Sequence, residues 1–263
     1  SMLLLSTSEI YGDPDAGNIP TSEDYRGFVS CTGPRACYDE SKRLAETLAT
    51  TYFRLFQTPV KSVRLFNEGC GVRQLDKLML DFGMPMGPLR LSDEVGLDVA
   101  QHVAADLQNR LPKPVPINDT LEKMIARGWL GKKSGTGFYV FPKEKGAKEQ
   151  PNDAAGFLQT VGKGQGQDAT TLLDRLVLVM VNEAARVLEE GVVEAPEDVD
   201  FGMIFGTGWA PFRGGPLRYA DTLGAAEIVK RLEKLAAEVA PYFAPCARLT
   251  EMGRSGRPFY PTG

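Results

Sequence analysis

The chain has 263 residues, of which 43% are hydrophobic and 24% are charged, enough to bury a core in one large domain or two small ones. Its formal net charge of -4 provides no global field that would attract nucleic acid, so we expect neither DNA nor RNA as a partner. The four cysteines lack the CxxC spacing of a zinc site and indicate reduced thiols, which predicts no metal site and a location in the cytosol or an organelle interior rather than secretion.

The first predicted element is a short buried strand at residues 3–6, an apolar run that is too short for a signal peptide and has no basic region ahead of it. A Gly- and Pro-rich loop follows over residues 12–34, and its length is typical of functional loops. Apolar side chains at helical spacing predict a helix over residues 35–56. Residues 60–66 read as a second strand, which would complete a right-handed parallel β-α-β unit.

Tyr38 and Lys42 lie four residues apart on the predicted helix, and therefore on the same face. An ammonium group beside a phenol favours the phenolate and lowers its pKa from about 10, which a tyrosine needs to act as a general acid or base near neutrality. A solvated helix face is the more common origin of such a pair. The surrounding sequence therefore has to decide between the two interpretations.

Three segments around this pair carry further information: STSEIYGDP at residues 6–14, GPRACYDESKR at 33–43 and VRLFN at 63–67. Together they resemble the extended short-chain dehydrogenases, and most closely the nucleotide-sugar epimerases and dehydratases such as UDP-glucuronate decarboxylase. That resemblance implies NAD as the cofactor.

The resemblance also implies roles for individual residues. Tyr38 and Lys42 would be the catalytic pair and would bind the cofactor, with Lys42 holding the nicotinamide ribose. Thr7 would hydrogen-bond a sugar hydroxyl, and Glu9 would lie beside the reacting carbon. However, no Gly-rich dinucleotide turn of the GxGxxG type occurs in the sequence, so NAD would lack a pyrophosphate cradle. We therefore expect no catalysis by residues 1–67 alone.

From Glu68 onward the sequence reads as short capped helices and contains an internal repeat. A Glu-Gly pair, an apolar residue followed by Asp, a Phe-Gly pair and a Gly-Pro-Leu triplet occur twice in the same order. They stand at residues 68–69, 75–76, 82–83 and 87–89, and again at 190–191, 199–200, 205–206 and 215–217. We predict two copies of one helical unit that pack together.

Apolar stripes and capping residues predict the helices of both copies. One helix is expected over residues 93–107 and a long buried one over residues 170–190. Asp119 and Glu122 form a capping-box pattern, and Asp221 is expected to cap the last long helix. No apolar run approaches the ~20 residues of a membrane span, so none is expected.

Several longer segments of this part match a second pattern: FGMPMGP at residues 82–88, DEVGLDV at 93–99, GWLGKKSGTGFY at 128–139, and the second copy at 200–221. They resemble the C-terminal region of 3-hydroxyacyl-CoA dehydrogenases, including the final domain of the multifunctional fatty-acid oxidation protein. The resemblance implies helical domains that help to enclose acyl-CoA and make subunit contacts. The catalytic His-Glu pair and the NAD-binding Rossmann domain of that family would lie upstream.

Two groups in this part remain as candidate ligand contacts. His102 is the single histidine, and we expect it to be a structural or surface residue. Lys132 and Lys133 could face the phosphates of CoA, although a solvated turn is the commoner location for such lysines.

The sequence therefore predicts a mainly α fold. Two tandem domains like the C-terminal domain of 3-hydroxyacyl-CoA dehydrogenase, residues 68–150 and 151–263, would follow an incomplete Rossmann-type β-α-β fragment, residues 1–67. Repeat one would lack the long helix that precedes repeat two. Open strand edges would favour a homo-oligomer, or a partner chain would supply a Rossmann domain.

Three functions remain open. The chain could be a noncatalytic helical module that binds acyl-CoA or a partner subunit in fatty-acid β-oxidation. It could be an NAD-dependent enzyme, either a 3-hydroxyacyl-CoA dehydrogenase completed by another chain or a nucleotide-sugar decarboxylase or epimerase that acts through Thr7, Glu9, Tyr38 and Lys42. It could also be a chimera, an artificial or misassembled fusion without activity.

Overall fold

The computed structural model describes residues 17, 57–110, 119–144, 146–159 and 168–260. The chain divides into two compact units, Ser1–Tyr52 and Phe53–Gly263, and every element named below lies in the second unit. The strand expected at residues 3–6, the loop at 12–34 and the helix at 35–56 lie outside the described residues.

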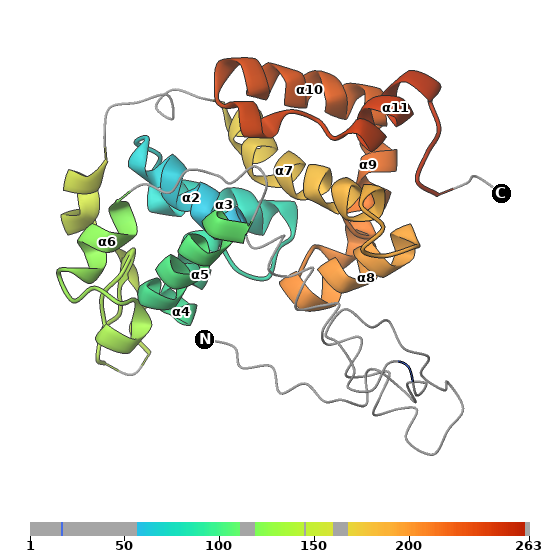
Figure 1. Ribbon diagram of the computed structural model, residues 1–263. Helices are drawn as coiled ribbons and strands as arrows, with labels where there is room; N and C mark the ends of the chain where they lie inside the picture. The colour runs from blue at the N-terminus through green and yellow to red at the C-terminus, as the bar shows by residue number, and fades with distance from the viewer. Residues whose placement is uncertain (1–16, 18–56, 111–118, 145, 160–167, 261–263) are drawn as a thin grey trace. The chain divides into compact units, whose positions relative to one another are not determined.

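Short helices make up most of repeat one, the part of the second unit before residue 160 (Figure 1). A small antiparallel sheet pairs Tyr139 with Pro151. The elements are α2 (Gln57–Asn67), α3 (Val72–Phe82), α4 (Pro88–Val95), α5 (Leu97–Arg110), α6 (Thr120–Ile125), η3 (Lys132–Ser134), β1 (Tyr139–Val140), β2 (Gln150–Pro151) and η4 (Asp153–Leu158).

Repeat two begins with the longest described helix and contains no strand among its described residues 168–260. Its elements are α7 (Ala169–Glu189), α8 (Pro196–Thr207), η5 (Pro211–Arg213), α9 (Pro216–Leu223), α10 (Ala225–Glu238), η6 (Pro241–Phe243) and α11 (Ala247–Ser255). The mainly α fold is therefore confirmed. Each described helix is too short or too polar to cross a membrane.

The strand prediction for residues 60–66 was wrong, because this segment lies inside helix α2. Val63, Leu65 and Phe66 are almost fully buried, and α2 packs against α4 and α7. The Phe66 ring meets the Phe138 ring edge-on, with 5.2 Å between centroids. Valines favour a strand locally, but burial of these side chains against distant helices favours the helix, as tertiary contacts commonly override propensity.

Helix α2 is the counterpart of the end of α7, so the expectation that repeat one lacks this helix was also wrong. After α2, the amides of Glu68, Gly69 and Cys70 donate to the carbonyls of Arg64, Phe66 and Leu65. The amides of Glu190, Gly191 and Val192 donate in the same pattern after α7, to Arg186, Leu188 and Val187. The proposed oligomer edge at residues 60–66 therefore disappears.

Three local expectations also need correction. The helix expected over residues 93–107 is broken by Gly96, whose φ of 106° ends α4 before α5 begins. Asp119 precedes α6 but makes no capping hydrogen bond with its side chain, which pairs with Lys123 instead. Asp221 lies inside α9 and does not cap α10, which begins after Gly224.

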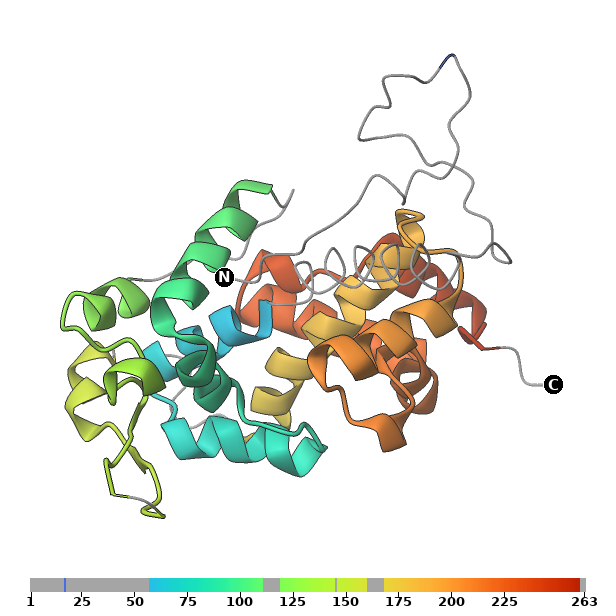
Figure 2. The same ribbon diagram turned by 90° about the horizontal axis from the view of Figure 1, so that it is seen from below.

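Helix α7 holds the two repeats together. It packs against α2 and α3 of repeat one and against α8, α9, α10 and α11 of repeat two. Figure 2 shows this yellow helix between the cyan and green helices on one side and the orange and red helices on the other. Across the same junction, the buried Arg175 donates to Glu68 at 2.8 Å, and Phe82 meets Trp209 edge-on at 5.2 Å. The described residues of both repeats therefore share one core.

Candidate functional site

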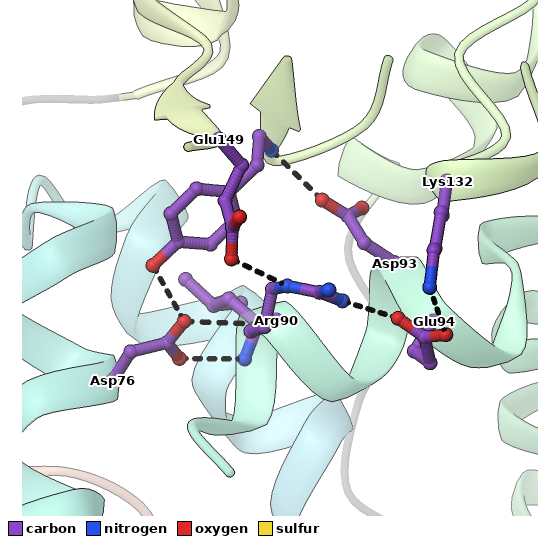
Figure 3. Close-up of polar contacts among 8 residues, drawn as sticks. Asp76, Arg90, Asp93, Glu94, Lys132 and Glu149 are labelled. Carbon is purple, nitrogen blue, oxygen red and sulfur yellow. Dashed lines mark hydrogen bonds and ion pairs between the residues drawn. The ribbon is translucent and has the colours of Figure 1, made fainter. Parts of the chain in front are cut away.

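A buried aspartate connects three elements of repeat one. The Asp76 carboxylate, on α3, accepts hydrogen bonds from the amides of Leu89 and Arg90 at 2.8 and 3.0 Å and from the Tyr139 hydroxyl at 2.7 Å (Figure 3). Helix α4 begins after Gly87, which has no side chain to cap its first amides. Asp76 therefore supplies the cap from a neighbouring helix.

A second buried aspartate ties the strand β1 to the helix α4. The Asp93 carboxylate accepts hydrogen bonds from the amides of Phe138 and Tyr139 at 2.9 and 2.8 Å. The Asp93 side chain has no solvent exposure. Asp76, Asp93 and Tyr139 together form what we call the first clamp, which fastens the segment around β1 to α3 and α4.

Burial controls the ionisation of this clamp. It raises the pKa of Asp93 to about 7, although the Phe138 and Tyr139 amides lower it in part. Burial also raises the pKa of Asp76 above its ordinary value, against the Tyr139 hydroxyl and the two helix amides. Burial and the nearby Asp76 raise the pKa of Tyr139, which therefore stays a phenol and donates a hydrogen bond to Asp76.

Ion pairs cover the exposed side of the clamp. The Arg90 guanidinium donates to Glu94 at 2.6 Å and to Glu149 at 2.9 Å (Figure 3). Lys132 donates to the other oxygen of Glu94 at 2.6 Å, and Lys133 pairs with Asp98. Both lysines are about half exposed and already have carboxylate partners. This arrangement favours the solvated turn over a site for CoA phosphates.

Repeat two contains the same arrangement, which we call the second clamp. The Asp200 carboxylate accepts from the amides of Leu217 and Arg218 at 2.7 and 2.9 Å and from the Tyr260 hydroxyl at 2.7 Å. The second clamp is completed by Asp221, which accepts from the amides of Phe259 and Tyr260 at 2.8 and 2.9 Å. Burial raises the pKa of Asp200, as it does for Asp76.

The two clamps stabilise the fold, because their carboxylates are occupied by hydrogen bonds to backbone amides and a tyrosine hydroxyl. The start of a helix is a natural position for a phosphate, but in α4 and α9 an aspartate carboxylate already occupies it. Gly87 and Gly215 leave space for these carboxylates, since a Cβ at either glycine would overlap the side chain of Asp76 or Asp200. The described part of the chain therefore offers no pyrophosphate cradle at these two helix ends.

The residues that the sequence predicts for catalysis belong to neither clamp among the described residues. Thr7, Glu9, Tyr38 and Lys42 lie outside the described residues. His102 is exposed on α5, which agrees with a surface role. Within the described ranges no group of three His, Cys, Asp or Glu side chains could hold a metal ion.

The clamps themselves were missed at the sequence level, although a signal for them was present. Asp76 and Asp200 belong to the repeated motifs that revealed the two copies. Asp93 and Asp221 follow the two Gly-Pro-Leu triplets at equal spacing, and a Phe-Tyr pair lies further along each copy, at residues 138–139 and 259–260. Comparison of all acidic and aromatic residues between the copies would have identified both clamps.

The stability of the chain should depend on the ionisation of Asp93. Because its folded-state pKa of about 7 lies above the ordinary value of about 3.9, the folded chain keeps this proton between about pH 4 and 7 while the unfolded chain releases it. Asp93 thus contributes stability that is fully present below about pH 4 and is lost as the pH rises through 7. We expect the urea midpoint to fall from pH 5 to pH 8, and to fall less in Asp93→Asn.

A matched control is Asp98→Asn. The Lys133 ammonium lowers the pKa of Asp98, so this carboxylate does not titrate between pH 5 and 8, and its replacement should leave the slope unchanged. Equal slopes in wild type and Asp93→Asn would contradict the assignment.

Comparison with known families finds the same family in both helical repeats. The family described as "3-hydroxyacyl-CoA dehydrogenase, C-terminal domain" matches residues 54–141 and again residues 172–263. The NAD dependent epimerase/dehydratase family matches residues 1–74. The two families therefore overlap over residues 54–74, which include α2.

Curated relatives point in the same direction. The fatty acid oxidation complex subunit alpha of Shewanella amazonensis is 38% identical over 200 residues, and that of Shewanella loihica is 39% identical over 200 residues. Each alignment covers 76% of this chain and 28% of the relative. The chain thus spans little more than a quarter of the length of these relatives.

Two solved structures share the fold at 22% identity. The 3-hydroxybutyryl-CoA dehydrogenase of Escherichia coli K12 matches with a TM-score of 0.60, over 77% of this chain and 60% of that one. The dehydrogenase part of multifunctional enzyme 1 from C. elegans matches with a TM-score of 0.58, over 88% and 54%. Together with the double family match, these findings show that the chain belongs to the family of 3-hydroxyacyl-CoA dehydrogenase C-terminal domains and is related to the dehydrogenases of fatty acid oxidation.

Proposed function

We propose that this chain is a noncatalytic helical module of the 3-hydroxyacyl-CoA dehydrogenase type, which helps to enclose acyl-CoA and makes subunit contacts. A partner chain would supply the Rossmann domain that binds NAD. The observation that carries this proposal is the duplicated clamp. In both repeats the buried carboxylates and phenols are engaged in holding helix ends and chain segments, which is the role of a scaffold rather than of a reaction centre.

The proposal gives the NAD cofactor to the complete assembly rather than to this chain. Both matching families are NAD-dependent, which supports NAD as the cofactor of the reaction. The described helix starts at α4 and α9 do not fit a dinucleotide pyrophosphate, because Asp76 and Asp200 already accept from their amides. No catalytic step is therefore assigned to the described residues.

A second candidate is nucleotide-sugar chemistry of the UDP-glucuronate decarboxylase type, and the match of residues 1–74 to the epimerase family favours it. In that case Thr7, Glu9, Tyr38 and Lys42 would act on the sugar, with Tyr38 and Lys42 also holding NAD.

A fusion origin without activity is the third candidate. It is favoured by the overlap of two families over residues 54–74. In this view the chain has three parts, and the join between the two helical repeats stays near residue 150. The first join lies before Gln57 rather than after residue 67, because α2 packs with the helical part.

Calorimetric titration of the full chain separates the candidates. We expect saturable binding of 3-hydroxybutyryl-CoA and no saturable binding of NAD up to about millimolar concentration, because the sequence has no Gly-rich dinucleotide turn and Asp76 and Asp200 occupy the amides at the starts of α4 and α9. NAD or UDP-glucuronate binding that disappears in Lys42→Ala would instead favour the nucleotide-sugar enzyme. No heat with any of the three compounds would favour the inactive fusion.

A further inference from the structure

An extended segment around β2 covers the first clamp. The strand β2 pairs with β1, and directly after it the backbone amide of Asn152 donates to the Phe138 carbonyl at 2.8 Å. The side-chain amide of Asn152 donates to the Gly137 carbonyl at 2.7 Å. Directly before β2, the Glu149 carboxylate accepts from Arg90 at 2.9 Å. A carboxylate and an asparagine three residues apart therefore hold this segment on the clamp.

The counterpart of Arg90 in the second clamp has no carboxylate partner among the described residues. Arg218 follows the second Gly-Pro-Leu triplet as Arg90 follows the first, and the amides of both donate to a clamp aspartate. Arg90 also pairs with Glu94, but the corresponding position in repeat two holds Thr222. The Arg218 side chain is exposed, and its guanidinium lies 3.6 Å from the centre of the Tyr260 ring. No ion pair joins it to a described residue.

Two backbone carbonyls beside Arg218 also lack the cover that repeat one provides. Because the two Phe-Tyr pairs correspond, the carbonyls of Pro258 and Phe259 take the place of the two that accept from Asn152 in repeat one. No described residue donates a hydrogen bond to either carbonyl. Pro258 is exposed, so this edge of the backbone is open to another extended chain.

We propose that an extended acidic segment of a partner protein binds the second clamp, in the way that the segment around β2 covers the first. Its carboxylate would pair with Arg218, and an asparagine three residues later would donate to the carbonyls of Pro258 and Phe259. Charge selects this occupant, because a planar guanidinium held against an aromatic ring matches a carboxylate and repels a basic segment. The inference goes beyond the proposed function, since it depends on the second clamp and not on acyl-CoA or NAD.

A peptide with the sequence AKEQPNDA, that of residues 147–154, is the probe, because it contains the segment that covers the first clamp. Its ends are acetylated and amidated, so that no terminal charge competes with the glutamate. Titration into the full chain labelled with ¹⁵N should shift the amide signals of Arg218, Phe259 and Tyr260 until they saturate. The peptide with Glu149→Gln should bind about tenfold more weakly, because the ion pair is lost.

Arg218→Gln in the full chain should weaken binding of the unchanged peptide by the same factor. The two replacements together should weaken it no further, because both remove one ion pair. Arg248→Gln is the matched control, since it removes an equal charge from an exposed position at the other end of α11 and should leave the affinity unchanged. Thermal unfolding checks that each variant is folded.

Two outcomes would overturn the proposal. One is the absence of saturable shifts at Arg218, Phe259 and Tyr260 up to about 5 mM peptide. The other is equal affinity of the glutamate and glutamine peptides for the wild-type chain, which would show that Arg218 does not select a carboxylate. Binding of acyl-CoA and NAD is measured separately, so failure of the proposed function would not be mistaken for failure of this contact.

Discussion

Replacement of Asp200 with alanine should lower the free energy of unfolding by about 3–5 kcal/mol. The substitution leaves three donors without an acceptor, the buried amide of Leu217, the buried hydroxyl of Tyr260 and the partly buried amide of Arg218. Each unsatisfied buried donor costs about 1–3 kcal/mol, and water that enters the space left by the carboxylate reduces the sum. Urea unfolding followed by circular dichroism measures the difference directly.

Two further variants separate the clamp from general effects of mutation. Tyr260→Phe removes one donor and leaves Asp200 bound to two amides, so the loss should be about 1–2 kcal/mol. Asp198→Ala changes an exposed acid on the same helix and should alter stability by no more than about 0.5 kcal/mol. If Asp200→Ala unfolds with the wild-type midpoint, the clamp is not a stabilising element. A loss of similar size in Asp76→Ala would show that the two clamps are equivalent.

Gly87→Ala should also destabilise the chain strongly, by more than about 3 kcal/mol. The added Cβ would overlap the side chain of Asp76, which cannot move without releasing the amides of Leu89 and Arg90. Overpacking at a buried site costs about 1–3 kcal/mol, and loss of the cap adds to it. A thermal unfolding scan at fixed pH gives the effect as a lower midpoint.

Gly71→Ala is a close control for this substitution. Gly71 precedes α3 with φ -68° and ψ 143°, and Gly87 precedes α4 with φ -70° and ψ 149°, so the backbone conformation is the same. A Cβ at Gly71 would meet only the Cβ of Gln74, at 3.8 Å, which is ordinary contact. We expect a change of less than about 1 kcal/mol. Equal midpoints for Gly71→Ala and Gly87→Ala would show that the space beside Asp76 is not limiting.

The features that the sequence predicted correctly are those with local causes. The apolar stripe of α3 ends at Gly83, whose φ of 111° only glycine adopts readily. The long stripe of α7 repeats at helical spacing, and its many buried side chains confirm the prediction. The two copies are visible because similar short motifs recur in the same order, and the double family match agrees with them. None of these signals needs information from a distant part of the chain.

The features that the sequence did not determine depend on partners far away along the chain. Residues 60–66 include two valines, which favour a strand, and burial against α4 and α7 makes the segment helical. Aspartate is a common helix cap, yet the carboxylate of Asp221 accepts hydrogen bonds from the amides of Phe259 and Tyr260, at the end of the described chain. A carboxylate can satisfy any amide within reach, so its residue type does not specify which one. Composition and periodicity thus determined the helices and their duplication, whereas the tertiary structure decided which helix ends each buried aspartate holds and which aromatic side chains stay exposed.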